Sequence, residues 1–376
     1  MGAATHDLET HVHRYPRRSA ALRFGIGLAA AALATAAWLP GAAAASTGWQ
    51  AVFQAHTGAS TIYNGLTSVS ASGRASAWAV GGTDLSGATP GAPVAEQWNG
   101  TSWQAATLPS GLTGTLGAVS TPASNDAWAV SQLTGYALHW NGTSWSVAKT
   151  WPEHQLATQI TGVNAFSPTD VWVFGGPGAN PGIGTWHLRG TTWHKVTGLA
   201  GAISTASAIS HADMWAVGAD SVAPDDILLH YNGTAWQQVT GMALTGLQFS
   251  DILALSDSNV WVTATKPGRL PQQLLHFDGT NWTSVPVPSA VQVRQIAPDG
   301  SGGLWFSAAR NSSQAPVAEH RSATGTWSSH PLATGAGQAF GITAIPGTTS
   351  LWASGFLQSS GGTGSDAVIW GHGPAT

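Results

Sequence analysis

The sequence predicts an all-β fold, and three observations support this prediction. The chain has 376 residues, of which only 8% are charged and 43% are hydrophobic, so it can bury a large core. Its 47 Gly, 20 Pro and 20 Trp residues favour many short strands joined by turns rather than helices. The third observation is a segment that recurs along the chain, in which two aliphatic and Trp-rich runs are separated by a turn sequence.

The clearest copy of this segment is ALHWNGTSW, from Ala137 to Trp145. Asn141 and Gly142 both accept the positive φ that a two-residue turn of the primed type requires, so we expect a tight hairpin here. Four other copies end in WNGTSW, YNGTAW, FDGTNW and LRGTTW, the last with Arg-Gly at the turn. The chain is therefore a repeat protein.

Two series of Trp residues set the number of units. The first lies inside strand-like runs such as DAWAVS and comprises Trp78, Trp128, Trp172, Trp215, Trp261, Trp305 and Trp352. The second closes the hairpins and comprises Trp49, Trp103, Trp145, Trp193, Trp236, Trp282 and Trp327. The intervals in the first series average about 46 residues, which is typical of four-stranded propeller blades. Each unit is predicted to contain strands a to d, with the first Trp on strand b and the second opening strand d.

The order of the two series predicts how the ring closes. Trp49 precedes any strand a, whereas the last unit ends after the strand around Trp370 without a strand d. The segment from Trp49 to Phe53 fits that missing position, and closing the ring in this way would remove two exposed sheet edges. Residues 46–376 are therefore predicted to form a seven-bladed β-propeller of four-stranded antiparallel blades, closed by the N-terminal strand. Trp and Val lie three residues apart in strand d, as at Trp193 and Val196, so apolar residues should face both neighbouring blades.

The first 45 residues are predicted to be an export signal. Arg17 and Arg18 precede an uncharged run from Phe24 to Leu39, and small residues near Ala44 offer cleavage sites. We therefore expect a secreted protein, or one on the cell surface. The alternative is an uncleaved anchor, because the uncharged stretch is about long enough to cross a bilayer. A membrane is expected as a partner only in that case.

At these repeats the chain resembles Trp-rich propeller repeats of secreted bacterial proteins. The turn from Asp278 to Trp282, DGTNW, looks like a shortened Asp-box of the sialidase-like propellers. The Asp-box carries one more residue between the acid and the Trp. The resemblance implies a propeller fold, in which the Asp-box is a structural turn. It does not imply sialidase activity, because the Arg cluster and the Tyr and Glu pair of that family match no stretch here. With no Cys, the copper chemistry of galactose-oxidase-like propellers is excluded.

Four His residues occupy one position of strand c in consecutive units. These are His139, His187, His230 and His276. Packed sheets lie about 10 Å apart, whereas ligands of one zinc ion lie within about 4 Å of each other. Equivalent positions around a ring cannot converge on one ion, so we expect these His residues to pack or to form hydrogen bonds. No metal, cofactor or catalytic residue is predicted.

Three Asp residues stand two positions before the strand-b Trp, at Asp126, Asp170 and Asp213. Other units have Ser, Asn or Gly there, the Gly being Gly303. We interpret all of them as turn formers whose short side chains bond the local backbone.

Residues that break the repeat are the candidates for binding. They lie in loops between strands b and c or between d and the next a, or on an inner strand: Trp151, Glu153, His154, Asp225, Asp226 and Arg294. Trp151 belongs to neither Trp series and precedes a Pro, so it is predicted either to be exposed and stack on a sugar ring or to anchor its loop against a blade. The three acids could instead provide the carboxylate pair of a glycosidase. Arg294 is expected to face the central channel.

The function expected from these residues is binding rather than catalysis. The partner is predicted to be an extracellular glycan or another extracellular polymer, or a cell-envelope protein. The first alternative is an enzyme, either a glycoside hydrolase or a polysaccharide lyase. The second alternative is a protein-interaction scaffold. A nucleic acid is not expected, since the formal charge is −4. We expect a monomer.

Overall fold

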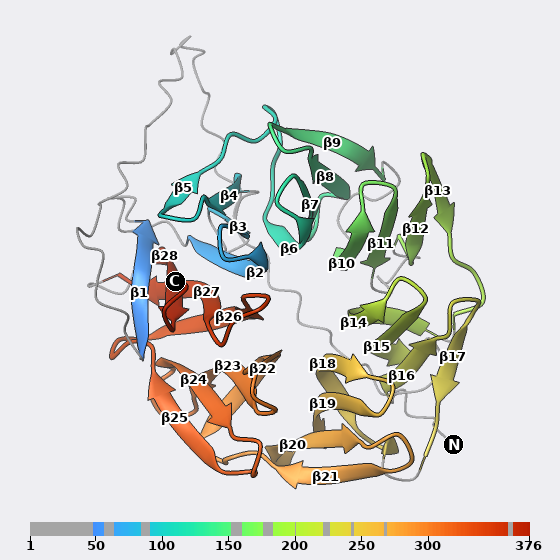
Figure 1. Ribbon diagram of the computed structural model, residues 1–376, viewed down its shortest axis with the longest axis vertical. Coiled ribbons are helices and arrows are strands. Elements are labelled where there is room, and N and C mark those ends of the chain that lie inside the picture. The colour runs from blue at the N-terminus through green and yellow to red at the C-terminus, as the bar shows by residue number, and fades with distance from the viewer. Residues whose placement is uncertain are drawn as a thin grey trace, which may run out of the picture. The chain divides into compact units, whose positions relative to one another are not determined.

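The computed structural model describes residues 48–55, 64–83, 91–151, 160–175, 183–199, 201–220, 226–241, 244–266, 269–359 and 364–376, all within one compact unit, Ala34–Thr376. These residues form seven four-stranded antiparallel sheets arranged around a centre (Figure 1), so the predicted seven-bladed β-propeller is confirmed. The part of the chain described here contains no helix capable of crossing a membrane. The predicted export signal lies outside the described residues.

The blades are numbered in chain order, and the strands of each are given from the innermost to the outermost. Blade 1 contains β2 (Gly65–Gly73), β3 (Ser76–Gly82), β4 (Pro93–Trp98) and β5 (Trp103–Ala105). Blade 2 contains β6 (Leu116–Ala123), β7 (Asp126–Ser131), β8 (Tyr136–Trp140) and β9 (Trp145–Thr150). Blade 3 contains β10 (Ile160–Ser167), β11 (Asp170–Gly175), β12 (Trp186–Arg189) and β13 (Thr192–Lys195). Blade 4 contains β14 (Gly201–Ser210), β15 (Asp213–Asp220), β16 (Asp226–Tyr231) and β17 (Trp236–Val239).

The remaining three blades follow the same pattern until the last strand. Blade 5 contains β18 (Gln248–Ser256), β19 (Asn259–Lys266), β20 (Arg269–Phe277) and β21 (Trp282–Pro286). Blade 6 contains β22 (Val291–Pro298), β23 (Leu304–Arg310), β24 (Pro316–Arg321) and β25 (Trp327–Pro331). Blade 7 contains β26 (Gly337–Ala344), β27 (Leu351–Gln358), β28 (Ser365–His372) and, as its outermost strand, β1 (Trp49–Ala55).

The ring is closed by the N-terminal strand, as predicted. β1 pairs antiparallel with β28, with Trp49 opposite His372 and Ala55 opposite Ala367, and Figure 1 shows the two strands side by side. The indole of Trp49 also packs edge-on against Trp305 of blade 6, with ring centroids 5.5 Å apart. At the centre, the innermost strand of each blade contacts that of the next, and β26 contacts β2. The N-terminal strand therefore completes one blade and also braces its neighbour.

The hydrophobic core is divided among the interfaces between blades. The described residues form seven buried clusters, one for each pair of neighbouring blades. Trp193 packs in the cluster between blades 2 and 3, whereas Val196 packs in that between blades 3 and 4. The predicted opposite orientation of Trp and Val is confirmed. Burial on both faces of every sheet explains why the strands do not alternate strictly between apolar and polar residues.

Polar side chains on the innermost strands of blades 1 to 6 form hydrogen bonds to the backbone of the next blade. Each innermost strand carries a register shift near its start, as between Leu66 and Ser68 of β2. Beyond that shift, the Oδ2 of Asp251 accepts a hydrogen bond from the backbone N–H of Ile296 in blade 6, at 2.7 Å. Such bonds satisfy backbone groups of the innermost strands and link neighbouring blades.

The hairpin turn differs from the prediction. Trp140 pairs with Trp145, so four residues, and not two, connect β8 to β9. Only Gly142 of these has a positive φ, 94°. Asn141 instead uses its side chain, because its Oδ1 accepts the backbone N–H groups of Thr143 and Ser144, both at 3.0 Å. The predicted two-residue primed turn is therefore wrong in blade 2, where Asn141 is required as a hydrogen-bond acceptor rather than for positive φ. In blade 3, by contrast, Arg189 pairs with Thr192, so two residues do connect β12 to β13.

Candidate ligand-binding groove between blades 3 and 4

The His residues of strand c belong to a unit that recurs in five blades. In each, the strand-b Trp stacks on a His with ring centroids 3.9 to 4.5 Å apart. The Nε2 of that His is bonded at 2.7 to 3.1 Å to an Asp or Asn that begins strand b or, in blade 6, lies in the turn before it. The units are Trp128–His139–Asp126, Trp172–His187–Asp170, Trp215–His230–Asp213, Trp261–His276–Asn259 and Trp305–His320–Asp299.

These units confirm one prediction and correct another. The His residues serve packing and hydrogen bonding, as expected. The Asp residues were predicted to bond the local backbone, but the Oδ1 of Asp126 bonds His139 of strand c at 2.9 Å. Asp170 and Asp213 do the same with His187 and His230. Sequence spacing did not reveal this pairing, because the His becomes a neighbour of the turn only when strands b and c are in register.

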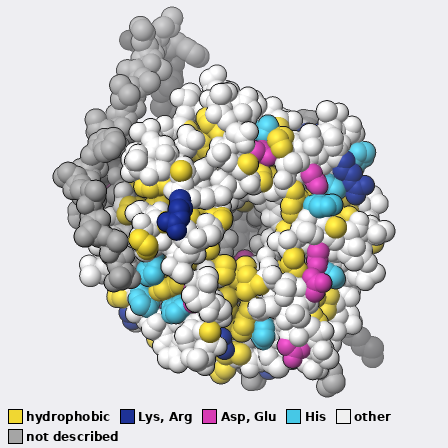
Figure 2. All heavy atoms as spheres, viewed as in Figure 1, with side chains coloured by type: hydrophobic (Ala, Val, Ile, Leu, Met, Phe, Trp, Pro, Cys, Tyr) yellow, Lys and Arg dark blue, Asp and Glu magenta, His cyan; other side chains and the backbone are white. Residues whose placement is uncertain are grey.

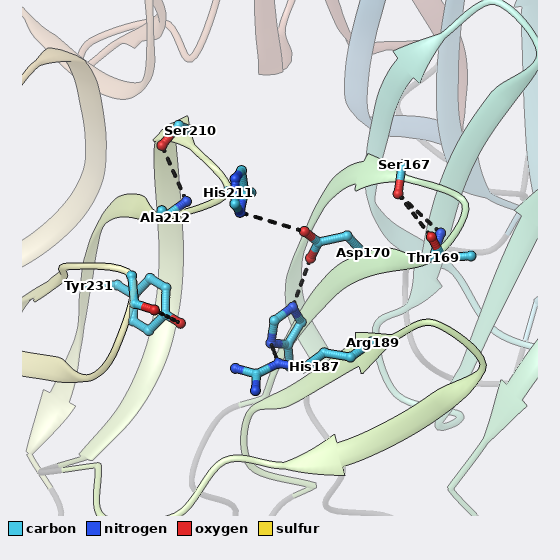
Figure 3. Close-up of polar contacts among 10 residues, drawn as sticks. Ser167, Thr169, Asp170, His187, Arg189, Ser210, His211, Ala212 and Tyr231 are labelled. Carbon is cyan, nitrogen blue, oxygen red and sulfur yellow. Dashed lines mark hydrogen bonds and ion pairs between the residues drawn. The ribbon is translucent and has the colours of Figure 1, made fainter.

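Blade 3 departs from the other blades at its hairpin turn. Arg189 occupies the position at which blades 1, 2, 4 and 5 have an Asn or Asp that accepts backbone N–H groups. A guanidinium has only donors. The Nε–H of Arg189 instead donates to the Nδ1 of His187 at 2.9 Å, as Figure 3 shows. Because Nδ1 accepts a hydrogen bond, the His187 proton is on Nε2, from which it is donated to Asp170 at 2.7 Å.

The electrostatics of this chain of hydrogen bonds favour a neutral imidazole. Burial lowers the pKa of His187 below its usual range, and the charges of Arg189 and His194 lower it further, whereas Asp170 raises it. The other oxygen of Asp170 lies 4.0 Å from the Nδ1 of His211, an exposed residue of blade 4. Asp170 therefore lies between His side chains of two blades (Figure 3).

A groove of about 320 Å³ runs along the boundary between blades 3 and 4. Blade 3 contributes cationic or titratable side chains, namely Arg189, His194 and Lys195, and blade 4 contributes the aromatic Tyr231 and Trp236. Figure 2 shows basic and His side chains gathered over β12 and β13. The rest of the lining is Trp172, His187, Val196, Thr197, Gly198, Leu199, Thr234 and Ala235. A hollow of this size with convergent polar groups is typical of ligand-binding sites.

A second hollow, of about 430 Å³, lies over blade 7 and the loop that leads to it. Its lining includes Gln54, Asp366 and residues 333–336 and 357–359. Within this hollow, the Nε2 of Gln54 donates to the Oδ2 of Asp366 at 2.9 Å. No Lys, Arg or aromatic side chain lines it among the described residues. It therefore offers less varied chemistry than the groove between blades 3 and 4.

Trp151 is not exposed. Its side chain is only 5% accessible and packs against Trp186 and Trp193, with ring centroids 6.1 and 5.7 Å away. Its backbone N–H donates to the carbonyl of Gly135 at 2.8 Å, which holds the indole in place. The prediction of an exposed stacking platform is wrong, and the alternative, a loop anchor, describes Trp151. A large indole gains more free energy by covering an open blade edge than by remaining in water.

Of the other predicted site residues, those that the structure describes lie at different interfaces between blades. The Oδ2 of Asp226 accepts the backbone N–H of Phe249 at 2.6 Å, across the interface of blades 4 and 5. Arg294 lies at the interface of blades 6 and 7, where it donates to the Oε1 of Gln338 at 3.1 Å and lies over the ring of Phe340. Trp151 belongs to the interface of blades 2 and 3. Glu153, His154 and Asp225 lie outside the described residues.

Sequence reasoning missed the groove residues, although one signal was visible. The Arg-Gly of LRGTTW was the one turn among the five copies in which the acceptor residue was replaced by a cation. His194 and Lys195 follow on the same hairpin. The contribution of Tyr231 and Trp236 could not be found in this way, because both follow the repeat pattern and line the groove only through the packing of blade 4 against blade 3.

Comparison with known proteins supports the fold. No protein-family model matches the chain, and no curated protein matches its sequence. YCF48 bound to D1 peptide superposes with a TM-score of 0.58 at 15% identity, covering 86% of this chain and 96% of that chain. An inactive virginiamycin B lyase from Staphylococcus aureus has a TM-score of 0.56 at 11% identity, covering 81% and 94%. The extracellular domain of the two-component system BT4673 from B. thetaiotaomicron has a TM-score of 0.57 at 12% identity, covering 86% and 40%. These likenesses show a shared propeller fold.

Proposed function

We propose that this chain is an exported, non-enzymatic binding module that recognises an extracellular polymer in the groove between blades 3 and 4. The observation that supports this proposal is that the cationic wall of the groove comes from one blade and the aromatic wall from the next. Both walls belong to hairpins of adjacent blades in a closed ring, which favours a site that is formed before the ligand arrives, so that little conformational entropy is lost on binding. The predicted export signal supports a location outside the cytoplasm.

The structural neighbours support binding as the role of the ring. One neighbour, YCF48, is bound to a D1 peptide, and another neighbour is an extracellular domain. The hydrolase alternative gains no support from Asp226, since one of its oxygens is held by the backbone of Phe249. Among the described residues, no group of three or more His, Asp or Glu side chains is arranged to hold a metal ion.

The test is binding of the purified chain to an array of extracellular polysaccharides and to isolated cell-envelope proteins. Trp236→Ala removes the aromatic wall, and Trp282→Ala removes the equivalent Trp of blade 5 as a control for lost packing. We expect Trp236→Ala to reduce binding at least tenfold and Trp282→Ala to leave it unchanged. Cleavage of the bound polymer, or equal binding by both variants, would contradict the proposal.

A further inference from the structure

We infer that the groove between blades 3 and 4 is specific for an acidic polysaccharide, whose uronate carboxylates bind Arg189. This inference rests on the proposed function and deepens it. The groove concentrates basic groups in a chain that has only 13 Lys and Arg residues and a net charge of −4. Arg189, His194 and Lys195 all line it, and all three are exposed. No Asp or Glu lines it among the described residues. Of the two hollows, only this groove therefore has a charge complementary to that of an anionic ligand.

The hydrogen bonds of Arg189 orient its guanidinium toward the ligand. Its Nε–H is bonded to His187, which in turn bonds Asp170. The two terminal nitrogens make no hydrogen bond to the described residues, and Figure 3 shows them on the side of His187 that faces Tyr231. Two parallel N–H groups on one planar fork match the two oxygens of a carboxylate. Asp170 and His187 act as positioning residues, because His187 holds the guanidinium through Nδ1 and Asp170 holds His187 through Nε2.

The opposite wall favours a sugar over a peptide. Trp236 is partly exposed and presents its indole to the groove, and the buried Tyr231 packs behind it with ring centroids 5.3 Å apart. Such an aromatic side chain packs against the apolar face of a sugar ring. An acidic peptide would gain most by adding a strand to a sheet edge. The outer strands at the groove, β13 and β17, have only four residues each, and short edges resist such pairing.

The variant that tests this inference is Arg189→Asn. It places at the turn the residue that blades 1, 2 and 4 already carry, so the hairpin is expected to fold. The control is Arg74→Asn, which makes the same substitution at an exposed turn of blade 1 and removes the same charge. Binding is measured by titration calorimetry with three probes of similar length: an oligogalacturonate, its methyl ester, and an oligoglutamate.

The expected result is that the oligogalacturonate binds, and that the methyl ester binds at least tenfold more weakly. Arg189→Asn should weaken oligogalacturonate binding at least tenfold, Arg74→Asn should not, and higher salt should weaken it for the wild type. If the oligogalacturonate and its methyl ester bind equally well and both lose affinity for the Trp236→Ala variant, the acidic specificity is overturned. The proposed binding function then remains intact. Tighter binding of the oligoglutamate would replace the sugar by an acidic peptide. Binding of none of the three probes would also overturn the inference, whereas the binding function fails only if the wider array is negative too.

Discussion

At the scale of single residues, one substitution in a repeat has created a charged group with a fixed orientation. Four blades have an Asn or Asp that accepts backbone N–H groups at the hairpin turn, and blade 3 has Arg189. His187 of the same blade can accept a hydrogen bond from Arg189, because its Nε2 bonds Asp170 and its Nδ1 faces away from Asp170. The structural unit common to five blades therefore supports, in one of them, the residue that we propose binds the ligand.

Glu96, on β4, is a buried acidic residue. It is only 7% exposed, and one of its oxygens has no hydrogen-bond partner among the described residues. Its neighbours across the sheet are Ala79 and Ala105, which offer no compensating charge. Burial raises the pKa of Glu96 from 4.5 to about 8. A carboxyl in this position is more stable when protonated than when ionised.

We predict that Glu96→Gln stabilises the protein at alkaline pH. In the unfolded chain Glu96 ionises near pH 4.5, whereas in the fold it ionises near pH 8. Between these values the unfolded state binds fewer protons, so the free energy of unfolding of the wild type falls as the pH rises. The Gln variant lacks this dependence. Urea unfolding at pH 5 and pH 8.5 should show a small difference at pH 5 and a larger gain for the variant at pH 8.5. An equal difference at both pH values would show that Glu96 does not titrate in this range.

At the scale of elements, the hairpin depends on an acceptor at its first turn residue. Asn99, Asn141, Asn232 and Asp278 each accept two backbone N–H groups through Oδ1. The following Gly has a positive φ between 85° and 95° in the same four blades. The sequence pattern located these turns correctly. Their length was misjudged, because Asn-Gly serves both two-residue turns and turns in which only the Gly adopts positive φ.

We predict different effects on stability for two substitutions at this position of the hairpin. Asn141→Ala leaves two backbone N–H groups without a side-chain acceptor, so the free energy of unfolding should fall by about 1 kcal/mol. Arg189→Asn provides that acceptor in blade 3 and should not lower it. Urea unfolding of both variants at pH 7 measures the difference. If Asn141→Ala unfolds at the wild-type urea concentration, the side-chain acceptor does not stabilise the hairpin.

At the scale of the whole ring, closure joins residues from the two ends of the described chain. β1 covers the edge of β28, and the indole of Trp49 contacts both His372 of its own blade and Trp305 of blade 6. Without β1, β28 would expose a full row of unpaired backbone groups, and the cluster between blades 1 and 7 would lose Val52 and Phe53. Exposed edges of this kind promote association between molecules.

We predict that deletion of residues 49–55 lowers the unfolding midpoint and promotes association, as measured by urea unfolding and light scattering. Trp49→Ala retains the strand and loses only the aromatic contacts, so it should destabilise the ring less and leave the molecule monodisperse. A truncated chain that unfolds at the wild-type midpoint would show that β1 is not needed to hold the ring closed.

The number of blades, their four strands and the closure by β1 could all be predicted from the sequence, because each depends on residues that recur at a regular spacing. The candidate site could not. The positions of Trp151, Asp226 and Arg294 were decided by three different interfaces between blades, and each side chain found its partner there. The groove exists only because Tyr231 and Trp236 of blade 4 pack beside the hairpin of blade 3. Periodic spacing determines which elements form, whereas contacts between side chains distant in sequence depend on how those elements pack, and that was decided by the tertiary structure alone.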